Sequence, residues 1–227
     1  MTMRAEAKRP RRIWPWIAIG ATLIVATVIA IAVVGNNPTR APLATATPSK
    51  TSGTPTPQDA NPTGCLGGGE RNAKMVLAAR SAAPHTSKGA IEVGTSFVRW
   101  LNQYPYPTAG DITEVQGAAI SARAQTKDIG AFFATNPNLS GGLVADNTPY
   151  FLSTVPGVYH LESAAPDEVT ASIGTALVVD GALSSTMKGA IAVTVRWEDG
   201  GWKFVSSKGT RTTQELYSIG QPFTSGC

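Results

Sequence analysis

The sequence predicts an α+β domain in which helices come first and an antiparallel sheet follows. Between residues 71 and 133 the apolar residues recur at helical spacing, whereas from Val158 onward they alternate with polar ones. Asp199-Gly200 then separates two alternating runs, which is a strong local signal for a β-hairpin. A helical part followed by a stranded part is typical of α+β domains.

Four segments of the first part are predicted helices. They cover residues 71–80, 90–104, 112–126 and 129–133, and the segment 134–150, rich in Asn, Pro, Gly and Asp, is predicted to be a loop. Ser87 is the expected N-cap of the second helix, and the Pro residues after Tyr104 should end it. The expected buried faces are Ala90, Val93, Phe97, Leu101 and Tyr104 in the second helix and Ile112, Val115, Ala119 and Ala122 in the third.

Four strands are expected in the second part. Residues 158–163 and 169–179 form the first two. In residues 191–197 the apolar Ile, Val and Trp side chains lie on one face, and residues 202–205 return as the partner strand after the turn. These strands are expected to pair as a curved antiparallel sheet.

The residues before this domain divide into three segments. Residues 1–12 are a basic tail, residues 13–35 a predicted transmembrane helix, and residues 36–62 a linker. The apolar run from Ile13 to Val34 has 22 residues, enough to cross a hydrocarbon layer of about 30 Å at about 1.5 Å per residue. A cleaved signal peptide is the alternative, but its apolar region would be shorter and would end at a small-residue cleavage site. The cations before the run predict that the N-terminus is cytoplasmic and the main domain extracytoplasmic.

The linker composition predicts an unfolded spacer, and the charge distribution argues against nucleic acid as a partner of the main domain. Six Pro and six Thr among residues 36–62 leave almost nothing apolar to bury, so the linker is expected to act as an unfolded spacer. The chain carries a net charge of +4, but residues 63–227 carry 12 basic and 13 acidic residues. The basic excess therefore belongs to the tail and linker, and no direct nucleic-acid binding by the main domain is expected. Membrane lipids are the expected contacts of residues 13–35.

The chain has two cysteines, Cys65 and Cys227, near the two ends of the extracytoplasmic domain at residues 63–227. Two cysteines allow one intramolecular pairing, and a disulfide persists on the exported side of a membrane. The sequence therefore predicts a Cys65–Cys227 bridge that joins the ends of the domain.

Residues that could carry chemistry are few. His85 and His160 are the two histidines, and no cluster of ligands indicates a metal site. Asp111 and Glu114 could line an apolar pocket, but acids at the start of a helix more simply favour the helix dipole. No catalytic residue, cofactor or metal is therefore expected. Trp197 and Trp202 flank the hairpin turn and become candidate partner contacts where they are exposed.

The order of three helices and a curved sheet with an aromatic hairpin resembles the cystatin-like cone of the nuclear-transport-factor-two superfamily. The residues that carry the resemblance are 90–101 and 193–204. Together with the single span and the linker, this layout looks like the bitopic scaffold proteins of type IV secretion and conjugation machines. Residues 64–69 and 99–101 are similar to sequences of actinobacterial mobile elements.

The resemblance implies a structural role. Such domains assemble around a transfer channel, so the expected partners are other envelope-assembly subunits and further copies of the chain, and no enzymatic activity is expected. Those scaffolds often carry two cones in tandem, whereas this chain has room for one. The alternatives are an accessory protein of a lipid importer, like the Mce-associated membrane proteins, and a small-molecule-binding cone domain.

Overall fold

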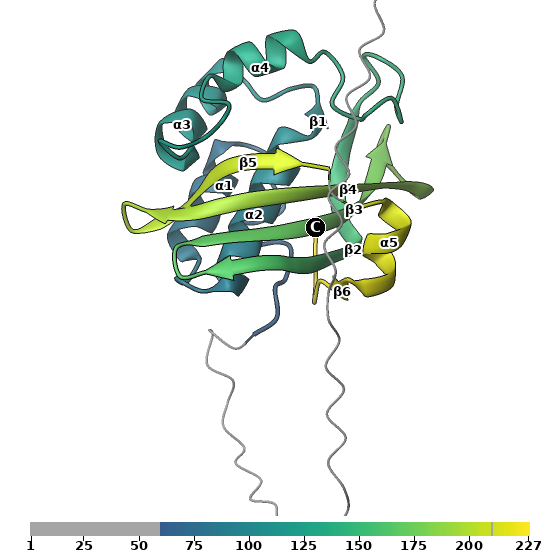
Figure 1. Ribbon diagram of the computed structural model, residues 1–227. Coiled ribbons are helices and arrows are strands. Elements are labelled where there is room, and N and C mark those ends of the chain that lie inside the picture. Colours follow the sequence, from purple (N-terminus) through teal and green to yellow (C-terminus); the bar gives the residue numbers. More distant parts are fainter. Residues whose placement is uncertain (1–59, 210) are drawn as a thin grey trace, which may run out of the picture. The chain divides into compact units, whose positions relative to one another are not determined.

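A computed structural model describes residues 60–209 and 211–227 of the chain. Helices precede an antiparallel sheet in this part, which confirms the α+β prediction (Figure 1). In chain order the elements are α1 (Ala73–Ala82), α2 (Ser87–Leu101), β1 (Gln103–Tyr104), α3 (Ala109–Ala119), α4 (Ile129–Thr135), β2 (Tyr150–Ala165), β3 (Glu168–Val179), β4 (Ala182–Glu198), β5 (Gly201–Lys208), α5 (Thr213–Ile219) and β6 (Gln221–Pro222).

The sheet has the strand order β1-β2-β3-β4-β5, and the short β6 pairs with β2. The pairings between these strands are antiparallel, and one isolated parallel bridge joins Ile120 to Phe204 of β5. The predicted hairpin is present between β4 and β5, and Asp199 and Gly200 both adopt positive φ, 52° and 74°, as a tight two-residue hairpin turn requires. β2 is longer than the predicted strand 158–163, because a register shift between Ser153 and Val158 lets pairing continue back to Tyr150.

The helix α2 packs across β2 to β5 and forms the centre of the core, with α1 on the same side of the sheet (Figure 1). Gly94 allows this close approach, since a Cβ at that position would lie 2.8 Å from Val193 Cγ1 of β4. Farther along α2, the Phe97 ring stacks on Phe204 of β5 with 4.0 Å between ring centroids. Large apolar side chains therefore fill the space between α2 and the centre of the sheet.

Both predicted boundaries of α2 are wrong. Thr86, and not Ser87, is the N-cap of α2, since its hydroxyl accepts the hydrogen bond from Gly89 N. The helix ends at Leu101, so Tyr104 belongs to β1.

The helix α3 ends at Ala119, seven residues before the predicted end, and Ala122 is exposed. Residues 120–125 instead run along the edge strand β5. Ser121 N donates to Phe204 O at 2.8 Å, and Gln125 N donates to Val205 O at 3.2 Å. Hydrogen bonds to the sheet edge thus replace those that a longer helix would have made.

The helix α5 was not predicted, although its start carries a recognisable signal. Thr212 is the N-cap and accepts a hydrogen bond from the backbone N–H of Glu215, three residues later. Thr followed after three residues by Glu is the capping-box pattern. Arg211 ties this helix to β2, because its Nε and Nη2 donate to the two carboxylate oxygens of Glu162 at 2.5 and 2.7 Å.

The Glu162–Arg211 pair predicts an acid-dependent contribution to stability. Hydrogen bonding from Arg211, aided by Ser172, lowers the pKa of Glu162 from 4.5 to about 2. Because the folded-state pKa is the lower one, this contribution is complete above about pH 4.5 and disappears as the pH falls toward 2. We expect Glu162→Gln to lower the unfolding free energy at pH 7, and the difference from the parent protein to vanish near pH 2 in urea denaturation.

Glu215→Gln is the matched control. Glu215 contacts Arg211 from the exposed side of α5, where water and salt screen the pair. Its replacement should lower the unfolding free energy less than Glu162→Gln does at pH 7. An equal loss for both variants would contradict the role assigned to Glu162.

None of the helices in the described residues combines the length and the apolarity that a bilayer crossing requires. The predicted tail, transmembrane helix and most of the linker lie outside the described residues.

Candidate functional site

The two ends of the described domain meet at one disulfide. Cys65 and Cys227 are bonded, with 5.4 Å between their Cα atoms. Thr154 of β2 supports both ends: its hydroxyl donates to Gly64 O at 3.0 Å, and its backbone N–H donates to Cys227 O at 2.9 Å. The bridge therefore lies against β2, near Thr154.

A buried carboxylate holds the segment that enters the domain. Glu92 of α2 is 7% exposed and accepts hydrogen bonds from the backbone N–H groups of Thr63 and Gly64 and from the Thr63 hydroxyl. A carboxylate buried in a helix face needs such donors to offset its desolvation. Glu92 thus fixes the entry segment, residues 62–68, on α2.

Arg99, two turns farther along α2, is fully buried. Its Nη2 donates to Gly68 O at 3.1 Å. Burial and, to a smaller extent, repulsion from Arg71 lower the pKa of Arg99 to about 10, and attraction to Glu92 opposes the shift. The guanidinium remains charged at neutral pH, so this face of α2 contains both a buried anion and a buried cation.

The aromatic residues of the hairpin have different environments. Trp202 is 1% exposed, and its indole N–H donates to Pro84 O at 2.9 Å. Because it is buried, Trp202 is not available to contact a partner in this structure. Trp197 is half-buried and stacks on His85 with 4.2 Å between ring centroids, so part of its surface remains available to a partner.

Asp111 stabilises the start of two helices. Its Oδ1 accepts from Ala73 N of α1 at 2.8 Å, and its Oδ2 accepts from the Thr108 hydroxyl at the start of α3. These hydrogen bonds, that from Ala73 foremost, lower the pKa of Asp111 below its usual range. Glu114 is exposed on α3. Asp111 therefore acts as a capping residue at these two helix starts.

The two histidines lie apart in the domain. His85 contacts Pro166 O and Asp167 near the β2–β3 turn, whereas His160 on β2 lines a cavity of about 290 Å³ beside Ser87 and Tyr159. Within residues 60–209 and 211–227, no group of three or more His, Cys, Asp or Glu side chains is placed to hold a metal ion.

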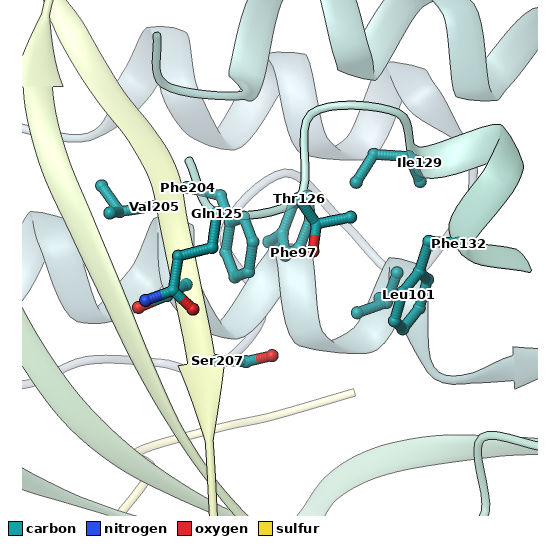
Figure 2. Close-up of a pocket in the computed structure, with 10 residues that line it drawn as sticks. Phe97, Leu101, Gln125, Thr126, Ile129, Phe132, Phe204, Val205 and Ser207 are labelled. Atoms are coloured by element: carbon teal, nitrogen blue, oxygen red, sulfur yellow. The ribbon is translucent and has the colours of Figure 1, made fainter. Parts of the chain in front are cut away.

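An apolar groove of about 130 Å³ lies between α2, α4 and β5. Figure 2 shows its apolar side chains, with the polar side chains of Gln125, Thr126 and Ser207 also lining it. The floor belongs to the stacked pair Phe97 and Phe204, and the apolar lining also includes Leu101, Ile129 and Phe132. We call this feature the β5 groove.

Local hydrogen bonds hold the wall of the β5 groove in place. Asp128 caps α4, and its Oδ1 accepts from Ala131 N at 2.8 Å. Gln116 of α3 reaches the same helix start and accepts from Ile129 N at 2.9 Å. The short α4 is therefore positioned from two sides, and the groove is preformed. Its chemistry suits one apolar side chain, with polar partners at the margin.

Comparison with protein families, with curated proteins and with solved structures finds no match for this chain. What the site can bind is therefore inferred from the residues that line it.

The β5 groove has no local signature in the sequence. Its lining comes from α2, the 120–128 connection, α4 and β5, and the predicted continuation of α3 through residue 126 would have replaced one wall. Thr126 follows the early end of α3, and this end depends on pairing with β5. The sequence does place Phe97 on a buried helix face.

Proposed function

We propose that this chain is a membrane-anchored structural subunit of a cell-envelope conjugation or type IV secretion-like machine. In this proposal residues 13–35 anchor the chain in the cell membrane, and the described domain is an extracytoplasmic cystatin-like cone without enzymatic activity. The disulfide supports the exported location, because such bonds persist in oxidising compartments. The helices that precede an antiparallel sheet, with α2 packed across it, support the cone assignment.

The β5 groove is the observation that carries the assembly role. Ligand pockets for small molecules usually have about 300 to 1,000 Å³, whereas this groove has about 130 Å³. A groove of this size fits one anchoring side chain of a protein partner, the kind of residue that dominates interface energies. The groove lies beside β5, an edge strand of the sheet, where residues 121–125 pair with it. Other envelope subunits and further copies of this chain are the proposed partners.

Cross-linking in native membranes tests the proposal. The tagged full-length chain should co-purify with the ATPase and the channel subunits of a conjugation machine after cross-linking. Recovery of lipid-importer components instead would assign the chain to the accessory class. Recovery of neither set would reject the assembly role.

A charge in the β5 groove should weaken these contacts. Thr126→Arg places a guanidinium among apolar side chains, and burying this charge against a partner is costly. We expect at least a tenfold loss of the cross-linked conjugation subunits, measured by quantitative mass spectrometry, with the chain still in the membrane.

Ala131→Arg is the matched control for Thr126→Arg. Ala131 is exposed on α4 and does not line the groove, so the same charge is added a short distance away. This variant should retain the parent level of cross-linking. Equal losses in both variants would show that the groove is not the contact.

A further inference from the structure

A second and larger cavity lies beyond the C-terminal end of α2. Its volume is about 480 Å³, within the range that small-molecule sites occupy. Leu152 and Leu177 line it from the sheet, and Leu139 and Leu143 line it from the loop between α4 and β2. These residues do not line the β5 groove. We call this feature the α2-end cavity.

Glycine residues, which have no side chain, leave part of this space open. Gly189 of β4 is the register partner of Thr175 in β3 and lines the cavity with it. A Cβ at Gly189 would lie 3.4 Å from the Thr175 hydroxyl, in ordinary contact, so a larger side chain would extend into the space. Gly141 of the loop also lines the cavity, and a Cβ there would meet no atom within 4 Å.

The cavity floor contains a hydroxyl without a partner. Thr175 is 1% exposed, and its Oγ1 forms no hydrogen bond within the described residues. Asn102, at the end of α2, is nearly buried and uses its side-chain nitrogen to donate to Val98 O at 2.9 Å. A mainly apolar wall with a few polar groups is the usual composition of a ligand site.

The charge at the cavity is positive. Lys188 of β4 is the one charged residue among those that line it, and its Nζ lies 4.4 Å from the centre of the Tyr217 ring of α5. Leu143, which also lines the cavity, is 47% exposed, so this apolar side chain borders solvent. An apolar chain can therefore lie among the leucine side chains, with an anionic head group near Lys188.

We propose that the α2-end cavity binds a single-chain amphiphile with a carboxylate head group, as in a fatty acid. The apolar chain lies against Leu152, Leu177 and Leu139, and the carboxylate lies near the Lys188 ammonium group. This binding is independent of the assembly role, because it uses a different cavity.

Photoaffinity labelling of the full chain in isolated membranes tests the site. The probes are a diazirine-bearing fatty acid of 14 carbons and the corresponding fatty alcohol. We expect the carboxylate probe to label peptides that contain residues 139–143 or 188–191. Excess unlabelled dodecanoate should compete, and dodecanol should compete less.

Filling the cavity should abolish labelling. Gly189→Leu is expected to reduce labelling by the fatty-acid probe at least tenfold. Leu143→Trp, which adds bulk where the lining borders solvent and leaves the floor intact, should do the same and guards against a folding defect in the first variant. Ala131→Arg should label as the parent chain does. Labelling that persists in both cavity variants, or that maps elsewhere, would overturn the proposal.

The head group is tested separately. Lys188→Ala should reduce labelling by the carboxylate probe about tenfold and leave the alcohol probe unchanged, and Lys188→Arg should restore the carboxylate signal. Equal effects on both probes would overturn the carboxylate assignment. Thr126→Arg should label normally, so failure of this inference is distinguishable from failure of the proposed assembly role.

Discussion

Removal of the Cys65–Cys227 disulfide is expected to lower the free energy of unfolding by about 4 to 5 kcal/mol. The bond joins residues 162 positions apart, so it closes a loop that includes almost the whole domain. In the chain-entropy model, a longer closed loop removes more freedom from the unfolded chain. Urea denaturation of the Cys65→Ser, Cys227→Ser double variant against the oxidised parent measures the difference.

The reduced parent protein is the control for this prediction. Its stability should match that of the double variant, because both lack the cross-link and keep the other contacts around Thr154. Either single Ser variant should behave in the same way. A loss below about 1 kcal/mol, or two free thiols in non-reducing mass spectrometry of the native protein, would contradict the prediction.

Trp202→Ala is expected to destabilise the domain by about 3 to 5 kcal/mol. The side chain is 1% exposed, packs against the rings of His85 and Trp197, and donates a hydrogen bond to Pro84 O. Alanine would leave a cavity and an acceptor without its partner. The loss of unfolding free energy in urea denaturation checks this expectation.

Two variants separate packing from the hydrogen bond. Trp202→Phe keeps much of the ring and loses the indole donor, so we expect a smaller loss, of which the hydrogen bond accounts for about 1 kcal/mol. Trp197→Ala should also cost less, because Trp197 is half-buried and its space opens to water. Equal losses for Trp197→Ala and Trp202→Ala would refute the assignment of Trp202 to the core.

The strands and their hairpin could be predicted because their signals are local. Alternation between apolar and polar residue types in the sequence identifies β3 and the second half of β4, although β3 is buried along almost its whole length. Asp199-Gly200 supplies the positive φ that the turn needs. Helical spacing identified α2 for the same reason. Its polar buried residues Glu92 and Arg99 carried no such signal, because their partners come from the entry segment, residues 62–68.

Tertiary contacts determine what the sequence did not predict. The end of α3 depends on hydrogen bonds between residues 121–125 and β5, so helical spacing alone overextends this helix. The β5 groove and the α2-end cavity share this property, since each collects residues from segments far apart in the chain. Gly189 illustrates the point: it precedes the predicted strand 191–197, and only its register pairing with Thr175 places it in a cavity wall.

The position of the disulfide also has a mechanical consequence. A force that pulls on the residues before Pro62 reaches Cys65 within a few residues, and there the covalent bond divides the load between two chain directions. One continues through Gly68, whose carbonyl accepts a hydrogen bond from Arg99, into α1, and the other leads back from Cys227 through β6, which is paired with β2. Unfolding the domain by such a pull would therefore require the contacts along both routes to break at the same time. Reduction would leave one, so the rupture force in single-molecule pulling should fall when the bond is reduced.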